Sequence, residues 1–332
     1  MTWSWLRAYY GTFAPDSLFV LALRDDDADA DVAFFPLQLN EPRPGRRFVQ
    51  YRTLLAGGSG GTSPADYTGV ICRPESEAEA LAAFAAYLRR IAPWDRLLMR
   101  DVQDPRVVRM LTAFSSPRFD VQAEEGVVCL YIDLPDAWED YLKHLSSSTR
   151  SNERRYIRAL ETDEALTIRA NGDGDVGAHF DTMFGLYRDR WPDMPDIFVR
   201  FAREVVACCH EEGRIYMPIL WHDDTPIGAG VTFLDHGADA VRYWITAYDQ
   251  AFASLSPGSI IRAHLTKWAI EQGYSTFDFL RGGEQYKHSY ATDERHNSYL
   301  RVRRRTLRTL RLRVSRKGIS MIRQLRSRAL AG

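Results

Sequence analysis

One stretch in the second half of the chain constrains the fold most, because each of its turns and helix ends is marked in the sequence. Three runs rich in β-branched and aromatic residues, 215–221, 227–234 and 240–248, are separated by the polar turns His222-Asp223-Asp224 and Asp235-His236-Gly237. Runs of this length joined by such turns predict a three-stranded antiparallel meander.

A helix with both ends marked follows the meander. Ser256 stands at the position of an N-cap, Pro257 in the first turn and Gly273 just past the last turn, and these residue types are favoured at those places. A strand is predicted directly afterwards, over 275–280. Strands that pair locally, followed by a helix and a further strand, are typical of an α+β fold.

The first half of the chain repeats this order. In each half a predicted helix leads to a strand that begins with an aromatic residue and an aspartate, Trp94-Asp95 in one and Phe277-Asp278 in the other. This indicates a duplicated α+β unit, each copy with a mainly antiparallel sheet flanked by helices. The other predicted helices are 76–91, 104–114, 138–145, 149–160, 179–190 and 198–212, and the other predicted strands are 17–23, 32–39, 47–54, 94–100, 127–134, 166–169 and 297–302.

The composition is that of a globular protein. The 332 residues suffice for two domains, and 45% hydrophobic with 26% charged residues exclude a disordered or fibrous chain. No apolar run approaches the ~18 residues of a membrane-spanning helix, and the first residues lack the pattern of a secretory signal. The four cysteines (Cys72, Cys129, Cys208 and Cys209) have no metal-ligand spacing, so we expect no metal and a reducing, cytoplasmic location.

Charge is distributed unevenly. The net charge is −1, but residues 301–332 hold twelve Lys and Arg and no acidic residue, so the rest of the chain carries −13. Apolar residues over 303–329 recur near one stripe, which predicts a basic amphipathic helix. It would contact an anionic membrane surface, at the inner membrane face, or fold back onto the acidic body. Nucleic acid is the rival partner, and we do not expect it.

The N-terminus of the helix that follows Ser256 is a candidate anion site. Backbone N–H groups are free there, the helix dipole is positive, and Gly258 lets a ligand approach the backbone without a Cβ in the way. The corresponding helix of the first half begins with Glu75, Glu77 and Glu79, which would repel an anionic cofactor. One cofactor site, in the second half, is therefore expected. The alternative is an ordinary capped helix.

Five segments of the second half form a recognisable set. They are the basic helix from Arg150 to Arg158, Arg190-Trp191, Ser256-Pro257-Gly258, Glu271-Gln272-Gly273 and Phe277-Asp278-Phe279-Leu280-Arg281-Gly282-Gly283-Glu284-Gln285-Tyr286-Lys287. Together they resemble the Gcn5-related N-acetyltransferase (GNAT) superfamily, specifically its CelD-type branch of cellulose biosynthesis, which is related to the FemAB peptidyltransferases. The resemblance is strongest over 137–303 and looser over 54–111.

The resemblance implies tandem acetyltransferase-like domains. Residues 1–135 would be a degenerate scaffold domain, with Pro135 marking the boundary. Residues 136–303 would bind acetyl-CoA or another acyl-CoA and carry the chemistry, and residues 304–332 would be the basic helical tail. Ile260 departs from the family pattern, which has a small residue at that place in the phosphate loop.

The expected donor site follows from the marked helix and the strand before it. The diphosphate would lie at Ser256, Pro257, Gly258 and Ser259, and the pantetheine would run along the strand that ends at Tyr248. The thioester would then lie near Asp278 and the loop behind it. There Asp278 is either a base or a structural partner, and Glu284 is a candidate base. Tyr286 is a candidate proton donor, and Lys287 is a candidate cation for a phosphate or carboxylate of the acceptor.

The acceptor side is less clearly marked. Arg150, Arg154 and Arg158 lie four residues apart, so they share one side of a helix and would suit an anionic acceptor such as a sugar nucleotide or a lipid phosphate. A solvated face is the alternative. Trp191 would line a sugar pocket or pack in the core.

These features predict a cytoplasmic acyltransferase that moves an acyl group, expected to be acetyl, from acyl-CoA to an amine or hydroxyl. The acceptor, an envelope or exopolysaccharide precursor, is implied by the resemblance alone. Two alternatives stay open. One is a FemAB-like transferase that uses aminoacyl-tRNA. The other is a non-catalytic ligand-binding or scaffold protein with a degenerate acyltransferase fold, which Ile260 favours.

Overall fold

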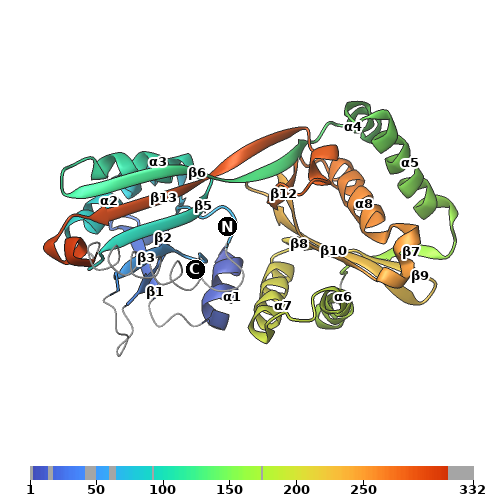
Figure 1. The fold of residues 1–332 in the computed structure, drawn as a ribbon, viewed down its shortest axis with the longest axis horizontal. Helices are drawn as coiled ribbons and strands as arrows, with labels where there is room; N and C mark the ends of the chain where they lie inside the picture. The colour runs from blue at the N-terminus through green and yellow to red at the C-terminus, as the bar shows by residue number, and fades with distance from the viewer. Residues whose placement is uncertain are drawn as a thin grey trace, which may run out of the picture. The chain divides into compact units, whose positions relative to one another are not determined.

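The computed structural model describes residues 3–13, 18–41, 50–59, 65–91, 93–172 and 175–312. They form two compact units. Unit 1 comprises the described residues of Ala14–Gly126 and of the segment that starts at Asn297, and unit 2 those of Thr2–Phe13 and Val127–His296. Two long strands, β6 (Phe119–Asp133) and β13 (Asp293–Arg304), contribute residues to both units (Figure 1).

This division differs from the predicted segments. The structure changes unit between Gly126 and Val127, inside β6, and not at Pro135. The N-terminal helix α1 (Trp3–Phe13) belongs to unit 2, because its aromatic side chains pack among those of α7 (Asp196–Glu211). Pro135 does end the strand, but a strand of fifteen residues is long enough to serve two cores before it ends.

Unit 1 confirms the predicted hairpin, helices and strand of the first half. Its strands are hydrogen-bonded in the order β1-β2-β3-β5-β13, with β4 beside β2; β3 and β5 run parallel and the other pairs antiparallel. The elements are β1 (Leu18–Asp25), β2 (Ala30–Asn40), β3 (Thr53–Ala56), β4 (Ile71–Cys72), η1 (Pro74–Ser76), α2 (Glu77–Arg90), β5 (Arg96–Val102), α3 (Pro105–Met110) and η2 (Leu111–Phe114). The predicted strand 47–54 begins outside the described residues, and within them it overlaps β3 only at Thr53 and Leu54.

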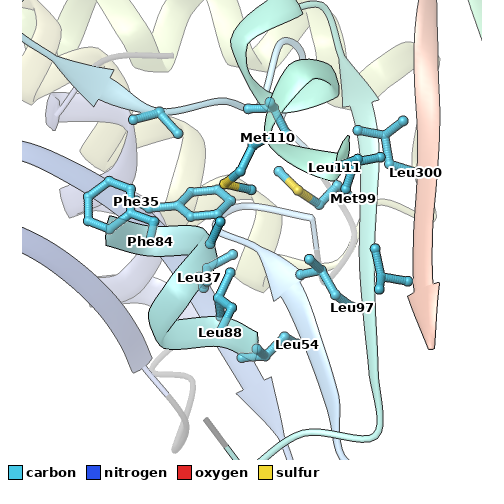
Figure 2. Packing of buried hydrophobic residues seen from close by; sticks show 14 of the residues in the cluster. Phe35, Leu37, Leu54, Phe84, Leu88, Leu97, Met99, Met110, Leu111 and Leu300 are labelled. Carbon is cyan, nitrogen blue, oxygen red and sulfur yellow. The ribbon is translucent and has the colours of Figure 1, made fainter. Parts of the chain in front are cut away.

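The core of unit 1 lies between its sheet and α2. Phe35 and Leu37 of β2 meet Phe84 and Leu88 of α2, which lie on the apolar stripe predicted for that helix (Figure 2). All four side chains are buried. The acidic N-terminus of α2, with Glu77 and Glu79 in its first turn, is as expected. No side chain caps its N-terminus.

The first part of the basic tail packs on unit 1. The backbone N–H of Arg304 donates to the Asp95 carbonyl at 3.0 Å, and the Arg308 guanidinium lies 3.2 Å from the Asp95 carboxylate. Leu312 is buried. Residues 304–312 therefore fold back onto the body, one of the two interpretations left open. The rest of the predicted tail helix, 313–329, lies outside the described residues.

Unit 2 confirms the meander, the marked helix and the strand that follows. Its strands are hydrogen-bonded in the order β6-β12-β11-β10-β9-β7, with β8 beside β10; β11 and β12 run parallel and the other pairs antiparallel. The elements are α4 (Trp138–His144), α5 (Ser147–Thr162), β7 (Leu166–Arg169), α6 (Val176–Arg190), α7, β8 (Ile215–Tyr216), β9 (Ile219–His222), β10 (Thr225–Asp235), β11 (Ala240–Tyr248), η3 (Gln250–Leu255), α8 (Pro257–Glu271), β12 (Thr276–Arg281) and η4 (Lys287–Ser289). The first predicted strand of the meander is split in two at Met217-Pro218, because proline has no N–H for the ladder.

Helices cover both faces of the sheet of unit 2. Helices α4, α5 and α8 share one hydrophobic core, and α1, α6 and α7 share another on the opposite face (Figure 1). Helix α8 lies close to β10 because Gly230 has no side chain. A Cβ there would be 2.9 Å from both Ile261 and Leu265. The fold is thus α+β, with mainly antiparallel strands flanked by helices, as the sequence predicts. No helix among the described residues is both long and apolar enough to cross a membrane.

Strands β11 and β12 pair over only three residues. The parallel register begins at Ala240 and Thr276 and ends at Arg242 and Asp278. Beyond that point β11 continues for six residues to Tyr248 without pairing to β12. The backbone edge of β11 beside β12 is therefore open, next to the N-terminus of α8.

Candidate active site

A cavity of about 670 Å³ lies beside this open part of β11. It brings together four segments of unit 2 that are far apart in the sequence: the end of α6, the second half of β11, the first turns of α8 and the loop after β12. The lining residues are Tyr187, Arg190, Trp191, Tyr243, Trp244, Ile245, Thr246, Tyr248, Ala253, Ser256, Pro257, Gly258, Ser259, Arg262, Glu284, Tyr286 and Tyr290. All five residues predicted for the donor are among them, as are Glu284, Tyr286 and Trp191.

The N-terminus of α8 lies in the wall of this cavity with a free backbone donor. Pro257 has no N–H, and within the described residues the N–H of Gly258 makes no hydrogen bond, whereas those of Ser259 and Ile260 both donate to the carbonyl of Ser256, at 2.9 and 3.1 Å. Ser256 has left-handed backbone angles (φ 60°, ψ 48°), and its side chain caps nothing. The position of the predicted N-cap is correct, but its capping bond is absent, which leaves the donor of Gly258 available.

Ile260, the departure from the family pattern, does not intrude into the cavity. Its side chain is buried in the core shared by α4, α5 and α8. A helix turns by about 100° per residue, so a large apolar residue two positions after Gly258 faces the core and not the ligand. The feature that favoured a degenerate, non-catalytic protein therefore has a structural explanation.

The ring of Tyr248 lies against the start of α8. A Cβ at Gly258 would be 3.1 Å from the Cδ1 atom of Tyr248, so glycine is what permits this contact. The Arg190 guanidinium lies over the Tyr248 ring, 5.0 Å from its centroid. Hydrogen bonds from Gln250 and from Arg190 lower the pKa of Tyr248. Arg190, Tyr248 and Gly258 thus lie together at one end of the cavity.

A buried ion pair supports the floor of the cavity. Arg262 of α8 donates two hydrogen bonds to Glu153 of α5, one of them at 2.9 Å, and the two residues are 3% and 0% exposed. Burial acts to lower the pKa of Arg262, but the nearby Glu153 carboxylate raises it above its ordinary value. The guanidinium also lies 3.4 Å from the ring centroid of Tyr290. This pair holds α5 against α8 and fixes the tyrosine that lines the cavity.

Glu284 and Tyr286 line the cavity from the loop after β12. Burial acts to raise the pKa of Glu284, but the hydrogen bond from Lys287 prevails and lowers it, so the carboxylate is ionised at neutral pH. Burial raises the pKa of Tyr286, so its hydroxyl keeps its proton. One group that can accept a proton and one that can donate one therefore face the same space.

Lys287 does not line the cavity. It is 5% exposed, and its ammonium group donates to the carbonyls of Phe279, Arg281 and Gly282 at 3.1 to 3.3 Å and to Glu284 at 2.7 Å. With its donors used in this way, it holds the loop that presents Glu284 and Tyr286. In the structure Lys287 thus stabilises this loop, and its ammonium group is not positioned to bind an acceptor.

Asp278 also lies outside the cavity lining. It is fully buried and pairs with Arg242 at 2.9 Å and with Arg295, and its second oxygen accepts the N–H of Leu280 at 2.8 Å. Leu280 has a positive φ of 58° at a point where the register of β12 with β6 shifts. Asp278 thus stabilises a bulge in β12, which is the structural role weighed against a base at this position.

The predicted basic face of α5 does not line the cavity either. Arg154 and Arg158 are exposed, and Arg154 pairs with Glu139 at 2.7 Å, while Arg150 donates to the carbonyl of Leu145 at 3.1 Å. The buried charge of this helix is the acidic Glu153. Trp191 behaves differently from the core residue considered as an alternative, since it is 52% exposed and lies in the cavity with Gly258.

Sequence reasoning missed Arg262, Tyr243, Tyr290 and the role of Arg190. Arg262 carried a signal, because it is the one charge in the otherwise apolar run from Ile260 to Leu265. The tyrosines carried none, since an aromatic residue on a strand or loop has the same pattern in a core and in a cavity. Among the described residues, no group of His, Cys, Asp and Glu side chains has the arrangement of a metal site.

Comparison with known proteins agrees with this geometry. Residues 147–288 match the family described as an acetyltransferase (GNAT) domain. That segment contains most of the cavity, from the end of α6 to the loop after β12. No curated protein matches the chain in sequence.

Solved structures share the fold over most of the chain. The crystal structure of FemX is 12% identical, with 88% of this chain and 90% of that chain covered and a TM-score of 0.57. L-PGS from Bacillus licheniformis is 11% identical, with 94% and 95% covered and a TM-score of 0.56. The C-terminal domain of a putative lysylphosphatidylglycerol synthetase from Agrobacterium fabrum is 9% identical, with 91% and 90% covered and a TM-score of 0.54. These similarities concern the fold alone, whereas the family match concerns one segment: residues 147–288 are similar to a GNAT-type acetyltransferase domain.

Proposed function

We propose that this protein is an acyl-CoA-dependent acyltransferase and that the cavity of unit 2 holds the donor. The observation that supports this most is that one cavity joins the free N-terminus of α8 to Glu284 and Tyr286. In this arrangement the donor diphosphate accepts a hydrogen bond from the N–H of Gly258, where the helix dipole is positive. The pantetheine runs along the open edge of β11, and the thioester lies near the loop after β12.

The lining residues suffice for direct acyl transfer. The nitrogen or oxygen of the acceptor attacks the thioester carbonyl, a C–N or C–O bond forms, and the C–S bond breaks. The ionised Glu284 accepts the proton that the acceptor loses, and the protonated Tyr286 gives a proton to the leaving thiolate. Lys287 keeps Glu284 in place, and the Arg262–Glu153 pair keeps Tyr290 in place.

The acceptor is proposed from the sequence resemblance. It is an amine or hydroxyl of an envelope or exopolysaccharide precursor, and the acyl group is acetyl. Attack from an acceptor in solution requires access to the loop that carries Tyr286, which is 45% exposed.

Binding measurements test the donor first. Calorimetry and thermal shift with acetyl-CoA, longer acyl-CoAs and aminoacyl-tRNA separate the candidates, because a ligand at 100 times its Kd adds about 2.7 kcal/mol of stability. We expect acetyl-CoA or another acyl-CoA to bind. Binding of aminoacyl-tRNA alone would favour the second candidate, an aminoacyl transferase. That candidate is raised by the lysylphosphatidylglycerol synthetase among the structures of similar fold.

Thiol release tests the chemistry. Tyr286→Phe should lower the rate by about 10²-fold or more, the usual effect of losing a proton donor, with donor affinity nearly unchanged. Tyr87→Phe, at an exposed tyrosine of unit 1, is the matched control. If acyl-CoA binds but no acceptor yields thiol release above background, the protein is a ligand-binding protein and not an enzyme.

A further inference from the structure

The cavity contains one cation that no acidic side chain neutralises. Of its two arginines, Arg262 is paired with Glu153, and its only acidic residue, Glu284, is paired with Lys287. Within the described residues no carboxylate pairs with Arg190. Its guanidinium instead lies over two aromatic rings, 5.0 Å from the centroid of Tyr248 and 5.9 Å from that of Trp191.

The position of Arg190 relates it to the free donor of α8. Tyr248 lies close to both Gly258 and Arg190, so the guanidinium and the helix N-terminus are at the same end of the cavity. A positive helix end and an unneutralised guanidinium at the same end of one cavity favour a ligand with more than one negative charge. The neighbouring Trp191 is half-exposed in the same cavity and offers a flat surface to an aromatic base.

We infer that the C-terminal end of α6 binds the nucleoside diphosphate part of the donor: Arg190 binds the diphosphate together with the N–H of Gly258, and Trp191 stacks on the base. Tyr248 is a positioning residue, because its ring lies against the start of α8 and its hydroxyl bonds to Gln250 and Arg190. This inference rests on the proposed function for the identity of the donor. It also moves Trp191 from the acceptor, where the sequence resemblance placed it, to the donor.

Three probes divide the donor into parts: inorganic diphosphate, acetyl-CoA, and acetyl-pantetheine, which lacks the phosphates, the ribose and the base. Arg190→Ala should weaken binding of acetyl-CoA and of inorganic diphosphate about tenfold, the lower range for a hydrogen bond to a charged group at an exposed side chain. It should leave acetyl-pantetheine unchanged. Trp191→Ala should weaken acetyl-CoA binding by a similar factor and leave diphosphate unchanged. Tyr248→Phe should weaken diphosphate binding less than Arg190→Ala does.

Arg188 provides the matched control. It lies two residues before Arg190 on the same helix and is exposed. It pairs with Asp196 at 3.5 Å and does not line the cavity. Arg188→Ala should bind all three probes like the parent. The affinity difference between the parent and Arg190→Ala should shrink as salt rises from 0.05 to about 0.5 M, because the contact is electrostatic and exposed.

The outcomes separate this inference from the proposed function. Equal binding of diphosphate and acetyl-CoA by the parent and Arg190→Ala overturns the inference while leaving the acyl-CoA donor intact. An equal loss for acetyl-pantetheine also overturns it, because it would show that Arg190 acts only by holding Tyr248. If the parent binds diphosphate through Arg190 but does not bind acetyl-CoA, the anion site stands and the proposed donor is wrong. If the parent binds neither, both are overturned.

Discussion

The buried pair between Arg262 and Glu153 makes the sharpest test of the physical account of unit 2. Removing one partner by Glu153→Gln leaves a guanidinium that is 3% exposed without a counter-charge. Breaking a buried pair in this way typically costs about 3–5 kcal/mol. We expect a loss of that size in the free energy of unfolding of unit 2, since the pair joins α5 to α8 across its core.

The residue next to Glu153 takes part in an exposed ion pair, and this pair supplies a matched control. Arg154, the next residue after Glu153, pairs with Glu139 at 2.7 Å, but these side chains are 51% and 62% exposed. Glu139→Gln should cost only about 0.2–1 kcal/mol, as exposed pairs do, because water solvates the arginine that remains. The two variants make the same chemical change, Glu to Gln, at the partner of an arginine, and they differ in the burial of the pair.

A double variant separates charge from packing. Glu153→Leu with Arg262→Met replaces the pair by apolar side chains, which in other buried pairs is neutral or stabilising. It should regain most of the stability lost in Glu153→Gln.

The measurement is urea unfolding, with hydrogen exchange of the α8 amides as the readout local to unit 2. The reasoning is refuted if Glu153→Gln loses no more stability than Glu139→Gln. It is also refuted if the double variant is as unstable as the single one.

Four further predictions follow from the site and its surroundings. Asp278→Asn should destabilise unit 2 by about 1.5–3 kcal/mol, the usual worth of a hydrogen bond to a charged group, because Arg242 and Arg295 lose this carboxylate while Arg242 keeps Asp235. The folded protein should keep its donor affinity; a stable variant with a strongly reduced rate would restore Asp278 as a base. Burial lowers the pKa of His264 to about 4, below its unfolded value of 6.5, so its contribution is present above pH 6.5 and about 3 kcal/mol of it is lost as the pH falls to 4. The free energies of unfolding of the parent and of His264→Gln, measured across this pH window, should therefore approach each other as the pH falls. A difference that stays constant with pH would contradict this prediction. Gly258→Val should abolish donor binding in calorimetry while unit 2 stays folded. If Tyr248→Ala restores binding to Gly258→Val, the block acts through the ring and not at the phosphate. A variant ending at Leu312 keeps the segment packed on unit 1 and should stay folded, but it should bind anionic vesicles more weakly than the full chain. Vesicle binding by the full chain should become weaker as the salt concentration rises. Binding that does not depend on salt, or no binding, would count against membrane contact.

Much of the local structure could be predicted because its causes are local. Short polar turns separate the strands of the meander, and Pro257 and Gly273 bound α8 in the structure as in the sequence. The apolar stripe of α2 meets the sheet of unit 1 as its spacing predicts. In each case the residues that decide the conformation are neighbours along the chain, so a single sequence contains the information.

The candidate site shows where such information ends. Asp278 and Glu284 are both acids near the end of β12 and gave the same signal, yet one is buried between two arginines and the other faces the cavity. Lys287 had the pattern of an exposed cation, but its ammonium group binds three backbone carbonyls. Which role a charged residue takes depends on partners such as Arg242 and the bulge at Leu280.

The sequence by itself therefore determined the elements, the α+β class and the helix end that faces the cavity. The tertiary structure alone decided the boundary inside β6, the pairing of Glu153 with Arg262, and the meeting of Arg190, Tyr248 and Gly258. The physical reason is range. Turn and capping preferences act over a few residues, whereas burial and ion pairing join groups such as Glu153 and Arg262, which are 109 residues apart in the chain, and only the folded chain brings such groups into contact.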